Sequence, residues 1–256
     1  MVLMGAHTYE ALRAVPGLKR GKTDAAESEP VRPVSDAMVD ATLPHLTPTV
    51  RAMVELQRHT GMRPGEVCIL RTCDVNADGA VWTYVPQHHK TEHAGRQRTV
   101  FVGPKAQAVL KPLLRHELQA YIFSPEKSEA ERREKMHAER VTPDGQGNGP
   151  GTNRVRRPKK TPGLRYDTTA YAHAVRFACE RTWPTPDGLD EAALKAWRRD
   201  HRWHPNQLRH SFATHVRREH GLEAAQVLLG HAAADVTQVY AERDSAKAAA
   251  VALKIG

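Results

Sequence analysis

The stretch HPNQLRHSFATHV, residues 204–216, combines the spacing of a packed helix with side chains that bind anions. Its apolar residues recur at the interval of one buried helical face: Leu208, Phe212, Ala213 and Val216. Polar residues surround the first turns: His204, Asn206, Arg209 and His210. A guanidinium such as that of Arg209 offers a planar fork of donors that fits a phosphate group. Alone, this group is more typical of a solvated helix face than of a site, so the rest of the chain must decide.

Three other stretches contain residues of the same chemical kind. TGMRPGEV holds Arg63 and Glu66, HHKTEHAGRQR holds Lys90, and LLGHAAADVTQVYAE holds His231 and Tyr240. Each has an ordinary explanation by itself: a helical i,i+3 ion pair, a hairpin lysine, a Gly–His turn and an exposed tyrosine. The order and spacing of the four stretches are more informative than any one of them.

In this order and spacing, the four stretches resemble the catalytic domain of the tyrosine recombinases, the phage integrase family, over residues 35–256. The strongest parts are LRHSFATH and the LLGH that is followed nine residues later by Tyr240. The resemblance implies phosphoryl transfer through a covalent protein–DNA intermediate. It also implies double-stranded DNA as the partner, self-association into a tetramer on that DNA, and neither a cofactor nor a metal ion.

The residues suit this chemistry. Negative charge grows on the non-bridging phosphate oxygens as phosphorus becomes five-coordinate, and two guanidinium groups can grip those oxygens. By motif position, Arg63 and Arg209 match the two arginines of the family, and His231 matches a hydrogen-bond donor to the same phosphate. Tyr240 matches the nucleophile, which forms a 3′-phosphotyrosyl link and frees a 5′-hydroxyl. Lys90 matches the lysine that protonates the departing 5′-oxygen.

Three supporting positions follow from the same resemblance. Glu66, one helical turn from Arg63, is expected to orient it, and His210 is expected to support the site from behind. Asn206 stands where the family usually has histidine; its amide can donate a hydrogen bond to phosphate but cannot accept the proton of the tyrosine. His204 lies two residues earlier, across a proline, and is not assumed to substitute.

The elements that must position these residues are mainly helices. Ser35 and Thr47 are expected to cap two helices that begin at Asp36 and Pro48, and another helix follows Pro104. Two β-like runs, 80–87 and 98–103, flank the polar connection that contains Lys90. Further helices are expected at 167–182, 205–219, 222–230, 235–243 and 245–255. The predicted class is α+β, mainly α-helical with a small antiparallel β-sheet, in the fold of a tyrosine recombinase catalytic domain.

The chain is expected to divide into an N-terminal remnant and linker, residues 1–34, and a catalytic domain, residues 35–256. Residues 1–34 include a short helical pattern, TYEALRAV, and are too short for the N-terminal helical domain that family members usually carry. Residues 126–165 form a charged and basic insertion that we expect to be mobile, although 126–140 also suits a solvated helix. Its basic residues are predicted to contact DNA phosphates or to be disordered: Arg154, Arg156, Arg157, Lys159 and Lys160.

Composition agrees with an anionic partner. The chain has 38 Lys+Arg against 29 Asp+Glu, a net charge of +9, which favours nucleic acid. Cys68, Cys73 and Cys179 include no CxxC pair and suggest reduced thiols; with the nearby histidines they match no zinc-ligand spacing. No signal peptide and no run of about 18 apolar residues is present. We therefore expect a cytoplasmic, nucleoid-associated protein.

Two alternatives to a site-specific recombinase or integrase remain at this point. One is a DNA-binding protein of the same fold with weak or lost catalysis, for instance through truncation and through Asn206. The other is a type IB topoisomerase-like activity, which shares the chemistry. The compact spacing from LRHSFATH to LLGH favours the recombinase.

Overall fold

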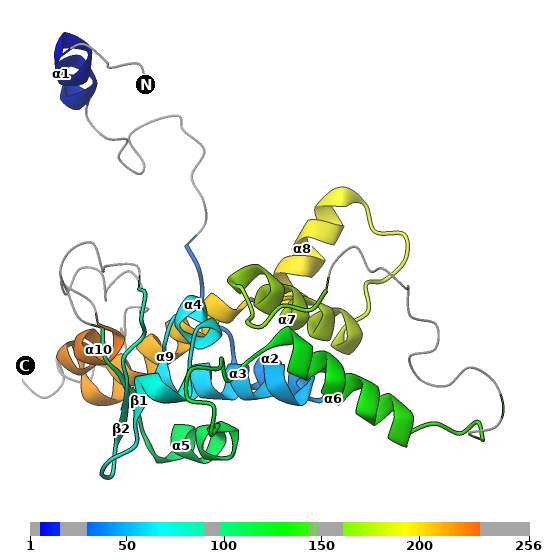
Figure 1. Ribbon diagram of the computed structural model, residues 1–256. Helices are drawn as coiled ribbons and strands as arrows, with labels where there is room; N and C mark the ends of the chain where they lie inside the picture. The colour runs from blue at the N-terminus through cyan, green and yellow to red at the C-terminus, as the bar shows by residue number, and fades with distance from the viewer. Residues whose placement is uncertain (1–5, 16–29, 90–97, 144–145, 147–160, 231–256) are drawn as a thin grey trace, which may run out of the picture. The chain divides into compact units, whose positions relative to one another are not determined.

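The computed structural model describes residues 6–15, 30–89, 98–143, 146 and 161–230 (Figure 1). Contacts divide the chain into two units, Met1–Val31 and Arg32–Gly256. The first unit contains helix α1 (Ala6–Ala14), which confirms the short helix expected in TYEALRAV. All other described elements belong to the second unit.

The second unit begins with helices whose ends the sequence specifies. Helix α2 (Asp36–Thr42) begins after Ser35, whose side chain accepts a hydrogen bond from the backbone N–H of Met38, and a short 3₁₀ turn, η1 (Leu43–His45), follows it. Helix α3 (Pro48–Thr60) begins in the same way after Thr47 and ends at Gly61, whose φ of 63° is left-handed. Side-chain caps satisfy N–H groups that the first helical turn leaves without partners. Both predicted caps are confirmed.

A three-stranded antiparallel sheet follows helix α4 (Pro64–Cys68) and the 3₁₀ turn η2 (Thr72–Asp74). Its strands are β1 (Val75–Asn76), β2 (Trp82–Tyr84) and β3 (Val100–Val102), in that order. In the register, Tyr84 pairs with Val75 on one side and with Val100 on the other. The two expected runs are confirmed as β2 and β3. Strand β1 was not predicted, because two residues are too few to show alternation.

Beyond the sheet lie helix α5 (Pro104–Leu110), the 3₁₀ turn η4 (Lys111–Leu113) and helix α6 (Pro125–Ala138). Of the two structures expected for 126–140, this stretch forms the helix. The helix is also attached to the start of α3: the Thr49 hydroxyl donates to Glu131 at 2.6 Å, and the hydroxyls of Thr47 and Ser128 lie 2.6 Å apart. Although charged residues surround α6, Ser128 and Glu131 attach the helix to the N-terminal end of α3.

Four helices complete the described fold: α7 (Thr168–Thr182), α8 (Glu191–His201), α9 (Pro205–His220) and α10 (Leu222–Leu229). Three of them match the predicted ranges. Helix α8 was not predicted, although Leu194 and Trp197 are spaced to lie on one face of a helix and are half-buried. The helices expected at 235–243 and 245–255 lie outside the described residues.

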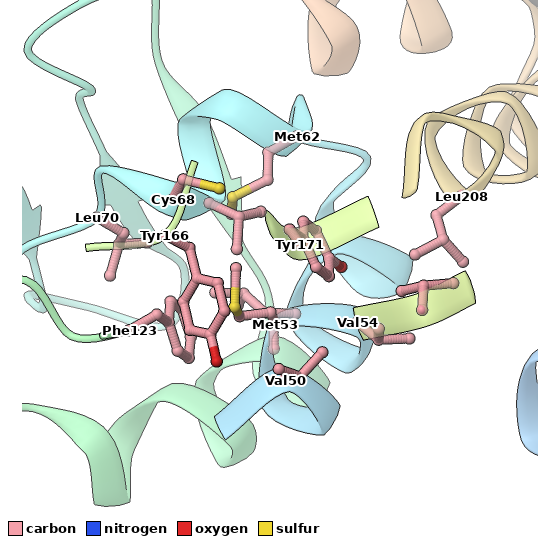
Figure 2. Packing of buried hydrophobic residues seen from close by; sticks show 14 of the residues in the cluster. Val50, Met53, Val54, Met62, Cys68, Leu70, Phe123, Tyr166, Tyr171 and Leu208 are labelled. Atoms are coloured by element: carbon pink, nitrogen blue, oxygen red, sulfur yellow. The ribbon is translucent and has the colours of Figure 1, made fainter. Parts of the chain in front are cut away.

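The core is built where α3, α4, α7 and α9 meet. Met53 and Val54 of α3, Tyr171 of α7 and Leu208 of α9 are all buried and belong to one apolar cluster, which Figure 2 shows. A buried aliphatic side chain contributes about 1.5–3 kcal/mol. The hydroxyl of Tyr171 also donates to the side chain of Gln57 at 3.1 Å. This packing fixes the end of α3 against α9.

Several properties of the described residues bear on function. None of the described helices has both the length and the apolar composition that a bilayer crossing requires. Cys68, Cys73 and Cys179 are free thiols, and the first and last of them are buried. The described part of the chain contains no group of three His, Cys, Asp or Glu residues placed to hold a metal ion.

Candidate active site

Arg63 is the N-cap of α4 and stands directly before a proline, which favours its extended backbone. Its backbone N–H donates to Glu66 Oε2 at 2.8 Å, and its guanidinium donates to Glu66 Oε1 at 2.9 Å. The arginine side chain is 21% exposed, whereas that of Glu66 is 2% exposed. The expected i,i+3 ion pair between Arg63 and Glu66 is therefore present. In it, a buried carboxylate fixes the position of a partly exposed guanidinium.

Glu66 is the acidic centre of a larger ion-pair network. Its Oε1 also accepts a hydrogen bond from Arg98 Nε at 3.3 Å. Burial by itself raises the pKa of this carboxyl, but the charges of Arg98, Arg63 and Arg209 and the hydrogen bond from the Arg63 backbone outweigh it, so the pKa is lowered. Glu66 is therefore ionised at neutral pH and surrounded by three arginines.

Arg98 is the member of this network that sequence reasoning missed. Only 3% of it is exposed, and it precedes β3 on the same face as the buried residues Val100 and Val102. Alternation along a strand puts every second side chain on one face. The alternation of Arg98 with Val100 and Val102 therefore indicates that Arg98 lies on the buried face of the strand. A buried arginine needs an acidic partner, so this pattern could have predicted the ion pair.

Arg209 lies in the second turn of α9 and is 1% exposed. Its NH1 donates to the carbonyl of Gly61 and its NH2 to the carbonyl of Leu229, each at 2.7 Å. The side chain therefore joins the C-terminal ends of α3 and α10. A guanidinium has several N–H donors, so holding two carbonyls does not use up its capacity to bind an anion.

The other polar residues of the opening stretch lie around the same turns of α9. Asn206 Nδ2 and His210 Nε2 are 3.5 Å apart, and His210 is buried. His204 is the N-cap of α9, and its backbone N–H donates to the side chain of Gln207 at 3.0 Å. Partial burial lowers the pKa of the His204 imidazole, so it is uncharged at neutral pH. The roles of these three residues stay predictions.

Other predicted site residues lie outside the described residues: Lys90, His231, Tyr240 and the basic set Arg154, Arg156, Arg157, Lys159 and Lys160. The described chain nevertheless reaches their immediate neighbours, His89 and Gly230. Gly230 caps α10 in the left-handed region with a φ of 64°, which favours glycine. Arg209 therefore holds the carbonyl just before the turn that leads to His231.

Comparisons with known proteins bear on the family and the fold of the chain. Curated proteins named tyrosine recombinase XerC match a short segment: that of Methylobacterium nodulans is 57% identical over 44 residues, and that of Serratia marcescens is 55% identical over 42 residues. These segments cover 17% and 16% of this chain. The matched part spans only 14% of the length of either relative.

Solved structures resemble the whole fold. The Tn1549 transposon integrase in complex with transposon right end DNA superposes with a TM-score of 0.56 at 14% identity, covering 98% of this chain and 76% of that one. A lambda integrase dimer bound to a core site gives a TM-score of 0.53 at 15% identity, covering 86% and 50%. At these identities the likeness establishes the fold, which is the tyrosine recombinase catalytic-domain fold expected from the sequence.

The family itself is established by the match of a whole-domain model. The model described as the phage integrase family matches residues 36–247. That range contains every residue proposed for the chemistry, from Arg63 to Tyr240. The chain is therefore a member of the phage integrase family, the tyrosine recombinases.

Proposed function

We propose that this protein is a site-specific DNA recombinase or integrase that cuts and rejoins double-stranded DNA through a 3′-phosphotyrosyl intermediate. The observation that carries the proposal is the meeting of Arg63, Glu66 and Arg209 around one buried network. These residues come from segments about 150 positions apart, and two of them are cations of the kind that binds a phosphodiester.

In this proposal the two arginines act on the phosphate. Charge grows on the non-bridging oxygens in the transition state, and preorganised guanidinium groups stabilise it without having to reorient. Glu66 holds Arg63 in place through two hydrogen bonds. The packing of α9 on α3 holds Arg209 in place. Both contacts exist without DNA, so the two guanidinium groups are positioned before DNA binds.

The proposed reaction then needs a nucleophile, an acid and a second donor. The hydroxyl oxygen of Tyr240 attacks phosphorus, and the bond between phosphorus and the 5′-oxygen breaks. Lys90 gives its proton to that oxygen, and His231 donates a hydrogen bond to the phosphate. The proton of Tyr240 passes to water, because the amide of Asn206 cannot accept it. Attack by a 5′-hydroxyl of another strand reverses these steps and rejoins DNA without ATP.

The same proposal extends to the partners. The net charge of +9 and the basic segment 154–160 suit the phosphate backbone of duplex DNA. Among the structural relatives is a lambda integrase dimer bound to a core site. We infer by resemblance that this chain also assembles on DNA, as a tetramer that pairs two sites. Its place of action would be the nucleoid, in the cytoplasm.

A covalent-capture experiment tests the proposed reaction. The protein is incubated with a library of nicked duplexes of randomised sequence, and adducts that survive denaturing electrophoresis are sequenced. A nick next to the cut lets the freed strand diffuse away, which traps the phosphotyrosyl link. We expect adducts on a limited set of sequences, mapped by mass spectrometry to Tyr240.

The outcomes separate the alternatives. Tyr240→Phe should abolish the adduct and leave DNA binding in place. Binding without any adduct from the wild type would favour the catalytically weak DNA-binding protein. Adducts without sequence preference, together with relaxation of supercoiled plasmid, would favour the topoisomerase-like activity. An adduct on another residue would contradict the assignment of the nucleophile.

A further inference from the structure

Arg98 is a buried cation to which the proposed mechanism assigns no step. It is 3% exposed, and it makes hydrogen bonds to partners from distant parts of the chain. Burying a charge is costly unless geometry and pairing are good. We propose that Arg98 is a positioning residue of the cleavage site, which holds both the carboxylate that orients Arg63 and the end of α10.

The first link runs from Arg98 to Arg63 through a shared atom. Glu66 Oε1 accepts from Arg63 NH1 at 2.9 Å and from Arg98 Nε at 3.3 Å. The backbone carbonyl of Glu66 also accepts from the hydroxyl of Tyr84 at 2.8 Å, which ties α4 to the sheet. The direction of the Arg63 guanidinium therefore depends on a carboxylate whose position Arg98 helps to fix.

The second link runs from Arg98 to the turn before His231. Arg98 NH1 donates to the carbonyl of Leu228 at 3.1 Å and to that of Thr99 at 2.9 Å. The neighbouring carbonyl, that of Leu229, accepts from Arg209. Two arginines thus hold two consecutive carbonyls at the C-terminal end of α10, where the helix leaves carbonyls without internal partners and favours cations.

Gly230 shows how closely Arg98 approaches this end of the helix. A Cβ at position 230 would lie 2.7 Å from Arg98 NH1, and the glycine has a left-handed φ of 64°. The space that a side chain would need is filled by the guanidinium. Arg98 therefore fixes the position of Gly230, the last described residue before His231, and it does so from a position two residues before β3.

The chemistry of these contacts requires arginine. Nε points to a carboxylate while NH1 serves two carbonyls, so the planar fork spreads its donors over three acceptors. The ammonium group of lysine is a single point on a flexible stem and cannot reproduce that spread. Arg98→Lys should therefore keep the charge but lose the alignment, and Arg98→Gln should keep a donor but lose the charge.

The test uses single-turnover cleavage of a nicked duplex that the wild type captures, so this inference rests on the proposed function. Arg98→Lys should slow cleavage by up to about 100-fold, because a misplacement of about 1 Å at a reacting site can cost 10²-fold in rate, with DNA affinity nearly unchanged. The matched control is Val102→Ala, because Val102 is buried on β3, four residues after Arg98, without belonging to the ion-pair network. Its cleavage rate should stay close to that of the wild type.

A second substrate distinguishes positioning from loss of fold. A methylphosphonate at the cleaved position carries no negative charge, so it needs the Arg63 guanidinium less. The deficit of Arg98→Lys relative to the wild type should shrink on this substrate. Equal deficits on both substrates, or a deficit no larger than that of Val102→Ala, would overturn the inference. Arg98→Gln provides the same comparison if the lysine variant does not fold.

The two proposals fail in different ways. If the wild type forms no adduct with any duplex, the proposed function is wrong and this inference falls with it. If the wild type forms adducts and both Arg98 variants cleave at the wild-type rate, the proposed function stands and only the positioning role is wrong.

Discussion

Gly61 lies at the end of α3, so close to α9 that a single added methyl group tests the contact between the two helices. Its φ is +63°, and a Cβ built there would lie 2.3 Å from Cδ1 and 2.8 Å from Cγ of Phe212. Carbon atoms pack at about 3.5–4.0 Å, so the ring would have to move by more than about 1 Å. The carbonyl of Gly61 also accepts a hydrogen bond from Arg209, so a shift here reaches the site.

The expected loss of stability has two parts. The left-handed conformation costs an alanine about 1–2 kcal/mol, and forcing a packed side chain aside costs about 1–3 kcal/mol. Gly61→Ala should therefore lower the free energy of unfolding by about 2–5 kcal/mol. Gly79 offers a matched control, because its φ is +78° but nothing lies within 4 Å of its Cβ position. Gly79→Ala should lose only the backbone part, about 1–2 kcal/mol.

Urea unfolding followed by tryptophan fluorescence measures both variants, since the chain has four tryptophans. The difference between the two losses isolates the collision with the Phe212 ring. Adding Phe212→Leu to Gly61→Ala should recover part of that difference by making room. Equal losses for Gly61→Ala and Gly79→Ala would show that α3 and α9 are not packed as described.

Three further predictions concern the charged and polar residues of the site. Because the pKa of Glu66 is lowered in the fold, its charge stabilises the folded state above the unfolded pKa of about 4.3, and this contribution is lost as pH falls through the folded pKa. Glu66→Gln should therefore make the free energy of unfolding, measured with urea, depend less on pH on the acid side. An unchanged acid side would contradict the ion-pair network. Single-turnover cleavage should keep rising from neutral to mildly alkaline pH, and Asn206→His should flatten the rise by supplying a base. His204→Ala should leave the profile alone, because the lowered pKa of His204 keeps it uncharged throughout that range; a profile that collapses in this variant would identify His204 as the base. Arg63→Ala and Arg209→Ala should each slow cleavage by about 10²-fold or more with a modest loss of DNA affinity. Only Arg209→Ala should also clearly lower the free energy of unfolding, because it removes the hydrogen-bond donor of two buried carbonyls. Equal losses of rate and affinity would show that both arginines only bind DNA.

The parts of the fold that depend on neighbouring residues could be predicted from the sequence. Ser35 and Thr47 specify helix starts because each caps its own first turn. The ion pair of Arg63 with Glu66 follows from their i,i+3 spacing, and the apolar interval of residues 208–216 predicts α9. Each of these signals lies within one or two turns of the structure that it specifies.

The arrangement of the site depends on contacts that no local pattern contains. Arg98 meets Glu66 across 32 residues and Leu228 across 130, and Arg209 reaches the carbonyl of Gly61 across 148. Motif position predicts that Arg209 serves a phosphate, but it does not predict that the side chain is buried with two carbonyls as partners.

The contacts of Arg209 also determine the electrostatic balance that a phosphate meets. The C-terminal ends of α3 and α10 both point their carbonyls at this guanidinium, and each helix end carries about −0.5 of an elementary charge. Three arginines are therefore opposed by one carboxylate and by two helix ends that together count for about −1. Among the described groups of the site, the remainder is about +1, which equals in magnitude the single negative charge of one phosphodiester.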